Sequence, residues 1–228
     1  MLLLIITLTL VLCSFLPQLW VRYTLRKYST ELEGMPGTGG ELAQHLIDRY
    51  ELNGVKLEQC DQGAGHYDPQ AKTVRLNPSY YHGRSLTAIA VAAHEVGHAI
   101  QYYRGERISQ LRAKYLPLSN RLQQAGTFVL LLLPVATAVI KTSSTFMALL
   151  ILSLVLQLAA ALIYLLILPE EWDASFNKAL PILISEGYLP EPYHAPVRKI
   201  LKAAALTYFA AALASLLNIS RWFMVFRR

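Results

Sequence analysis

Charged residues are scarce in this 228-residue sequence: Asp, Glu, Lys and Arg together make up 16% of it. Soluble domains carry about 25% charged residues. Hydrophobic residues account for 54% of the chain. The composition excludes a disordered or collagen-like chain. It favours a membrane protein with room for one modest domain outside the bilayer.

Cysteine is equally rare, with Cys13 in an apolar run and Cys60 in a polar stretch. Two distant cysteines exclude a disulfide-stapled secreted scaffold and argue against a metal site built from sulfur. The formal net charge of +6 could suggest nucleic acid. Because the basic residues gather beside apolar runs, membrane topology explains the charge better, and we expect no nucleic-acid partner.

Long apolar runs dominate the sequence, and a transmembrane helix needs about 20 mostly apolar residues. Three runs meet this length, at 1–21, 122–141 and 146–168. A fourth run, at 201–220, has a shorter apolar core at 203–217. No Lys or Arg precedes Arg22, so the first run is typical of an uncleaved anchor and not of a signal peptide. The sequence predicts a mainly α membrane protein with three to four transmembrane helices and a tail at 221–228. Whether the fourth run crosses the membrane stays open.

The basic residues that flank these runs predict the orientation. Lys and Arg gather at 22–27, 104–121 and 198–202, whereas Lys141 lies on the opposite predicted side. Short loops rich in Lys and Arg stay in the cytoplasm. We therefore expect an integral protein of a plasma membrane of the bacterial inner type, with segments 33–115 and 169–200 in the cytoplasm.

Segment 33–115 has the pattern of a small α+β domain at the cytoplasmic membrane face. The patterning predicts a helix, a strand, a strand–turn–strand unit and a second helix, at 41–52, 55–60, 63–76 and 86–103. Ser85 is a suitable N-cap for the second helix.

That second helix contains His94-Glu95-Val96-Gly97-His98. A spacing of four places both imidazoles on one face of a helix, where they can bind a single Zn²⁺. Glu95 would lie beside the metal, take a proton from the metal-bound water and return it to a leaving amine. The surrounding residues are almost all apolar, and burying these polar side chains without partners would cost several kcal/mol. The pattern therefore predicts a site for one zinc ion per chain.

A zinc ion bound by two histidines needs a third protein ligand. An extended motif would place Gly and His at positions 101 and 104, but these are Gln101 and Arg104. Glu170, Glu171 and Asp173 directly follow the third apolar run. Spacing alone does not choose between the carboxylates of this cluster.

The stretch His-Glu-Val-Gly-His-Ala-Ile-Gln at 94–101, with the blocks at 65–69, 83–86, 169–175 and 203–208, resembles the YugP-type family of membrane zinc metallopeptidases. The resemblance extends from about residue 33 to residue 217. In HtpX-type and prenyl-protease-type relatives, the third ligand is a Glu followed by an aromatic residue, any residue, Ala and Asp. Carried over by position, this resemblance implies a gluzincin-type site with Glu171 as the ligand.

The same resemblance bears on residues around the metal. Ser175 occupies the position of the relatives' Asp, which supports a ligand, and Asp173 is the alternative for that role. The resemblance also implies a peptide substrate extended along an edge strand, at 63–67 or 72–76. The candidates for contacting the substrate or stabilising the oxyanion are His66, Tyr67, His194 and Arg198.

The favoured hypothesis is a membrane-bound zinc endopeptidase that acts on protein or peptide substrates at the bilayer surface. The alternatives are an intramembrane zinc protease, an inactive zinc-binding scaffold and a zinc transporter. A transporter would show repeated halves with broken helices, and no such repeat is present. A homo-oligomer is left open.

Overall fold

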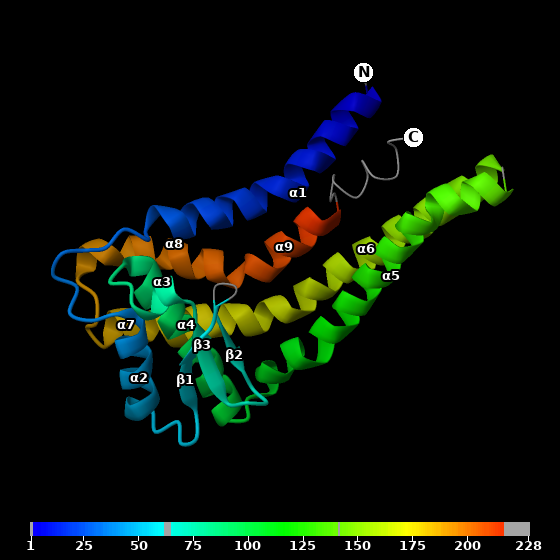
Figure 1. The fold of residues 1–228 in the computed structure, drawn as a ribbon. Coiled ribbons are helices and arrows are strands. Elements are labelled where there is room, and N and C mark those ends of the chain that lie inside the picture. The colour runs from blue at the N-terminus through cyan, green and yellow to red at the C-terminus, as the bar shows by residue number, and fades with distance from the viewer. Residues whose placement is uncertain (1, 62–64, 141, 217–228) are drawn as a thin grey trace. The chain divides into compact units, whose positions relative to one another are not determined.

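The structure is a computed structural model that describes residues 2–61, 65–140 and 142–216, and it is mainly helical with one small sheet (Figure 1). The chain divides into two compact units. Among the described residues, the helical unit comprises 2–19, 111–140, 142–167 and 208–216, and the sheet unit comprises 20–61, 65–110 and 168–207.

The sheet unit contains most of the short helices. They are α2 (Gly39–Arg49), α3 (Pro78–Tyr81), α4 (Leu86–Tyr103), η1 (Arg107–Ser109), η2 (Asp173–Ala179), α7 (Leu180–Ser185), η3 (Glu191–Tyr193) and α8 (His194–Ala205). The segment η2 is π-helical, whereas η1 and η3 are 3₁₀ turns.

Helix α4 is the centre of this unit. Its N-cap is Ser85, whose side chain accepts a hydrogen bond from the backbone N–H of Ala88, as the sequence predicts. Every residue from 86 to 101 is buried. Because α2, α8 and η2 pack around it, α4 needs an almost wholly apolar surface.

The sheet has three strands, β1 (Lys56–Gln59), β2 (His66–Asp68) and β3 (Thr73–Leu76), in the order β1-β3-β2. Strand β1 pairs with β3 in parallel, and β2 pairs with β3 antiparallel. Strand β3 is therefore central, and the expectation that 72–76 could be the edge strand is wrong, because β1 covers its second side. Strand β2 lies at an edge.

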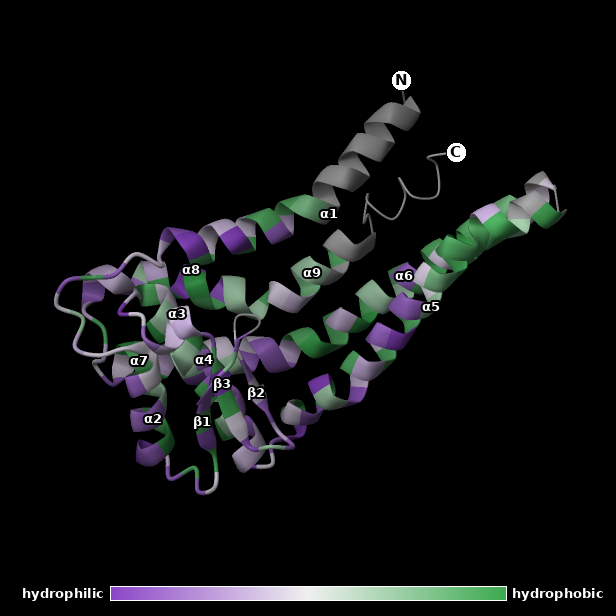
Figure 2. Ribbon diagram, viewed as in Figure 1, coloured by the Kyte–Doolittle hydropathy of each residue, from purple (hydrophilic) through white to green (hydrophobic). Residues whose placement is uncertain are grey.

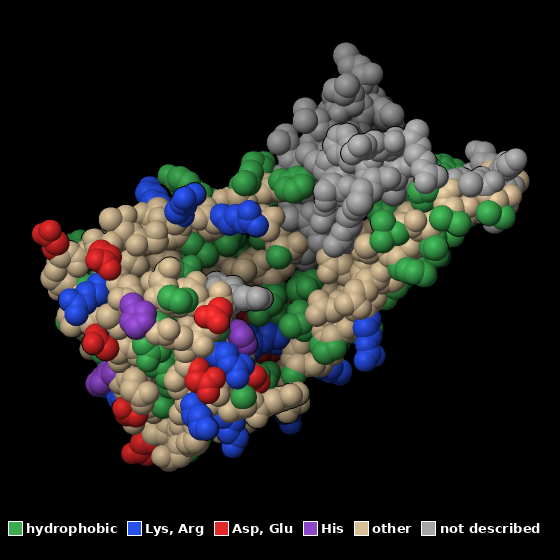
Figure 3. All heavy atoms as spheres, in the orientation of Figure 1, with side chains coloured by type: hydrophobic (Ala, Val, Ile, Leu, Met, Phe, Trp, Pro, Cys, Tyr) green, Lys and Arg blue, Asp and Glu red, His purple; other side chains and the backbone are tan. Residues whose placement is uncertain are grey.

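The helical unit is built on α5 (Gln110–Ile140) and α6 (Ser143–Trp172), with parts of α1 (Leu2–Lys27) and α9 (Thr207–Leu216). The polar interruptions of α6 are buried against α5: the Ser153 hydroxyl donates to the carbonyl of Gly126 at 2.8 Å, and the Gln157 amide donates to Ser153 Oγ at 3.0 Å. Large hydrophobic side chains are exposed instead, including Phe128 and Val155. Figure 2 shows hydrophobic residues, in green, along much of α5 and α6. The space-filling view shows such side chains along these helices (Figure 3).

One helical stretch among the described residues, Ser144–Ser185, is long and apolar enough to cross a membrane. The three or four predicted spans are therefore not supported. Each of the other predicted spans includes residues outside the described part of the chain, at 1, 141 and 217–220. The predicted span at 201–220 is also interrupted, because α8 ends at Ala205 in the buried core of the sheet unit and α9 begins at Thr207.

Gly97 allows α4 and η2 to approach closely. A Cβ at this position would lie 2.7 Å from the carbonyl oxygen of Ala174. Ala is favoured over Gly in a helix by about 1 kcal/mol, but this gain is too small for a clash with packed backbone. We expect Gly97→Ala to destabilise the protein by about 1–3 kcal/mol, measured by thermal unfolding in detergent.

Gly37→Ala is the matched control, because its Cβ would meet the side chain of Glu41, with Oε2 3.0 Å away, and not packed backbone. We expect it to change the unfolding temperature much less. Equal effects of the two variants would contradict the proposed close packing at Gly97.

Candidate metal centre

Three polar side chains of α4 lie inside the sheet unit: His94 is 4% exposed, Glu95 7% and His98 0%. The imidazole centroids of His94 and His98 are 4.7 Å apart. The two histidines are therefore neighbours on one buried helix face and are not solvated surface residues.

The last turn of α6 brings a carboxylate to these histidines. Glu171 Oε2 lies 3.3 Å from His94 Nε2 and 3.2 Å from His98 Nε2. One ligand atom from each of the three residues lies within 4.8 Å of the other two. Glu170, by contrast, approaches the other ring nitrogen, with Oε1 4.0 Å from His98 Nδ1. Of the two glutamates, the structure thus places Glu171 at the Nε2 atoms.

The environment of Glu171 favours its charged form. Burial raises the pKa of the Glu171 carboxyl, but the two imidazoles, when protonated and donating from Nε2, lower it well below its ordinary range. Glu171 follows the predicted membrane span at 146–168 in the sequence and lies outside it. An ionised carboxylate is the form that binds a metal cation.

Ser175 orients His94. Its hydroxyl lies 2.9 Å from His94 Nδ1 and donates a hydrogen bond to the carbonyl of Leu201 at 3.1 Å. Because the single hydroxyl proton is used on Leu201, Ser175 accepts the Nδ1–H of His94. His94 Nε2 then carries a lone pair on the side of Glu171, and this support needs no charge on Ser175.

Gln101 is the residue that sequence reasoning missed. Its Oε1 lies 2.9 Å from His98 Nδ1, and its amide nitrogen donates to Asp173 Oδ2 at 2.8 Å. Asp173 therefore approaches His98 through Gln101. The available signal was the position of Gln101 one turn after His98 on the same helix, but the sequence showed it only as a departure from an extended motif.

Strand β2 supports Glu95. The backbone N–H of Tyr67 donates to Glu95 Oε2 at 2.8 Å. The ring of Tyr67 packs against that of Tyr102, with 5.5 Å between the ring centroids. This bond fixes one carboxylate oxygen of Glu95 and places the edge strand next to the motif.

The other predicted contact residues lie elsewhere on the surface of the sheet unit. His66 is exposed on β2 and Arg198 is exposed on α8. His194 is half-buried and donates from Nε2 to the carbonyl of Leu189 at 2.9 Å. Of the four candidates, Tyr67 is the one with a hydrogen bond to the motif in the described part of the structure.

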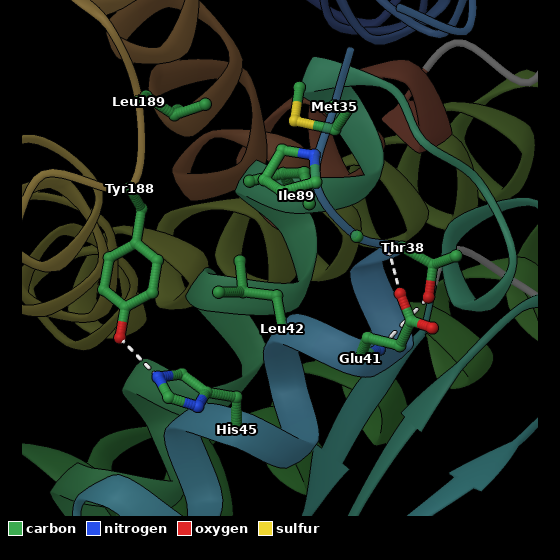
Figure 4. Close-up of a pocket in the computed structure, with 10 residues that line it drawn as sticks. Met35, Thr38, Glu41, Leu42, His45, Ile89, Tyr188 and Leu189 are labelled. Carbon is green, nitrogen blue, oxygen red and sulfur yellow. Dashed lines mark hydrogen bonds between the residues drawn. The ribbon is translucent and has the colours of Figure 1, made fainter. Parts of the chain in front are cut away.

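A mainly apolar pocket of about 320 Å³ lies in the sheet unit (Figure 4). His45 and Tyr188 close one side through a hydrogen bond of 2.8 Å. The lining comes from the 35–38 loop, α2, Ile89 and the 188–189 loop, and includes none of the three converging ligands. The pocket lining is therefore separate from the candidate metal ligands.

The donor set fits zinc. Two imidazole nitrogens and one carboxylate oxygen are the ligands of a catalytic zinc site, which keeps its fourth position open. The Nδ1 atoms of both histidines are engaged by protein partners, so the Nε2 atoms are the ones directed at Glu171. The geometry therefore defines a protein with a buried His-His-Glu cluster that could hold one metal ion.

Comparison with known proteins identifies the family. A family model described as "Putative neutral zinc metallopeptidase" matches residues 2–227, and the chain belongs to this family, whose cofactor is zinc. The chain is 38% identical over 215 residues to the "Putative membrane protease YugP" of Bacillus subtilis (strain 168), which covers 93% of this chain and 91% of the relative. No solved structure matches.

The two adjacent glutamates provide a matched test of the site. We expect Glu171→Gln to lose most of the bound zinc, because a neutral amide replaces an anionic ligand between the two imidazoles. Glu170→Gln should retain zinc, because its carboxylate lies at the opposite ring nitrogen. Both expectations are tested by measuring the zinc content per chain in detergent-purified protein. Zinc loss in the Glu170 variant alone would reverse the assignment.

Proposed function

We propose that this protein is a membrane-bound zinc endopeptidase of the gluzincin type, with His94, His98 and Glu171 as ligands and Glu95 as general base. The observation that carries the proposal is the convergence of three buried ligand atoms within 4.8 Å beside the glutamate of the motif. Zinc bound there would act as a Lewis acid and lower the pKa of a water molecule to about 7.

Glu95 performs the proton transfers in this proposal. The Tyr67 N–H holds Oε2, and Oε1 accepts the proton of the attacking water. The water oxygen bonds to the substrate carbonyl carbon, the C–N bond breaks, and Glu95 returns the proton to the leaving nitrogen. Strand β2 offers its backbone to an extended peptide. Tyr67 is the candidate contact residue with a hydrogen bond to the motif in the described structure, and His66, His194 and Arg198 remain candidates for contacts with longer substrates.

The membrane relative and the α6 span support a location at the bilayer. The proposal includes the further spans expected at 1–21 and 122–141 and a site that faces the cytoplasm of a plasma membrane. Helix α4 lies in the same unit as the sheet, and among the described residues the span criterion selects α6 instead. This arrangement favours action at the membrane surface over the intramembrane alternative.

Glu95→Gln tests the chemistry. The amide keeps the size of the side chain but cannot accept a proton, so we expect cleavage of fluorescently labelled casein to fall by about 10²–10⁴-fold while zinc per chain is unchanged. Chelation of the metal from the wild-type protein should abolish the same activity. Wild-type cleavage rates in the variant would refute the role of Glu95.

Cys60 is a native reporter of orientation, since it is a free thiol with partial exposure in the sheet unit. In a Cys13→Ala background, we expect a membrane-impermeant maleimide to label Cys60 in right-side-out vesicles only after permeabilisation. Lys141→Cys, in a chain without Cys13 and Cys60, should be labelled without it. Labelling of Cys60 in intact vesicles would overturn the cytoplasmic orientation.

A further inference from the structure

His98 has a different environment at each ring nitrogen. Its Nε2 lies 3.2 Å from Glu171 Oε2, and its Nδ1 lies 2.9 Å from Gln101 Oε1. A neutral imidazole carries one N–H, and the position of that proton decides whether Nε2 has a lone pair for a metal. His98 and Gln101 are both fully buried, so no bulk water takes part in this choice.

The orientation of the Gln101 amide follows from its other partners. Its Nε2 donates to the carbonyl oxygen of Glu170 at 3.0 Å and to Asp173 Oδ2 at 2.8 Å. Both partners accept hydrogen bonds, so both amide protons are used on them. A flipped amide would place its oxygen against these two acceptors and lose both bonds. Oε1 must therefore face His98, where it can only accept.

We propose that Gln101 is a positioning residue for zinc binding: its Oε1 holds His98 as the Nδ1–H tautomer, so that the Nε2 lone pair faces the metal. Through the carbonyl of Glu170, the same amide ties α4, which carries two ligands, to the residue directly before Glu171. The inference rests on the ligand set of the proposed function and is independent of peptide-bond cleavage.

The Asp173 carboxylate, which accepts a hydrogen bond from Gln101, is itself held in place. Asp173 Oδ1 accepts from the Asn177 amide at 2.7 Å, and Oδ2 also accepts from Lys178 Nζ at 3.0 Å. Lys178 in turn donates to Glu106 Oε2 at 3.0 Å. Because every bond in this chain has a defined donor and acceptor, the polarity of Gln101 matters in addition to its volume.

Gln101→Leu keeps the approximate volume and removes both functions of the amide. We expect its zinc affinity, measured by chelator competition, to fall by about 10- to 100-fold, as for other residues that orient a ligand. Gln157→Leu is the matched control, since Gln157 is also a buried amide but binds Ser153 in the helical unit. It should leave zinc affinity unchanged. Thermal unfolding of the metal-free samples separates a loss of fold from a loss of metal.

Exchanging the hydrogen-bond donor and acceptor between residues 101 and 173 tests the positioning role even if the leucine variant does not fold. Gln101→Glu retains an acceptor for His98 but faces the Asp173 carboxylate, so we expect weaker zinc binding. Adding Asp173→Asn restores a donor opposite residue 101, and the double variant should bind zinc more tightly than Gln101→Glu alone.

Two results would overturn the proposal: wild-type zinc affinity in Gln101→Leu, or no recovery in the double variant. Glu171→Gln in the same assay tests the ligand set independently. If it retains zinc, the proposed site fails, whereas zinc loss there with no effect at Gln101 refutes the positioning role alone.

Discussion

The architecture of the sheet unit depends on one constraint: α4 buries two imidazoles, a carboxylate and an amide away from bulk water. An unpaired polar group in such a place costs several kcal/mol. The partners come from other segments, with Tyr67 on β2 and Glu171 and Ser175 around the end of α6. The edge strand and the α6–η2 junction must therefore lie against α4, and the side chains that satisfy the helix also form the candidate metal site.

The π-helical segment η2 carries much of this pairing. Its residues Asp173, Ser175 and Lys178 all take part in the network around the two histidines. Such segments occur frequently at functional sites. The same rule governs the helical unit, where Ser153 and Gln157 pair internally while hydrophobic side chains face outward. Internal pairing of polar groups is what a bilayer demands of any helix that crosses it.

Local features were predictable because they depend on neighbours in the chain. The four-residue spacing of His94 and His98 and the N-cap Ser85 fix the helix and one face of the site. The alternating patterns at 55–60 and 63–76 gave the three strands, though not their order. Spacing alone left Glu170 and Glu171 open, and the family resemblance indicated Glu171, whose side chain lies at both Nε2 atoms.

The sequence by itself determined the helix that carries the motif, the apolar runs and the zinc-peptidase family. Only the tertiary structure decided that β3 is central, that α8 ends at Ala205 inside the core, and that Gln101 and Ser175 hold the two histidines. These features depend on contacts between segments far apart in the chain: His94 and Ser175 are separated by 81 residues. A periodic pattern records which face of an element is buried, but not which distant side chain will complete its hydrogen bonds.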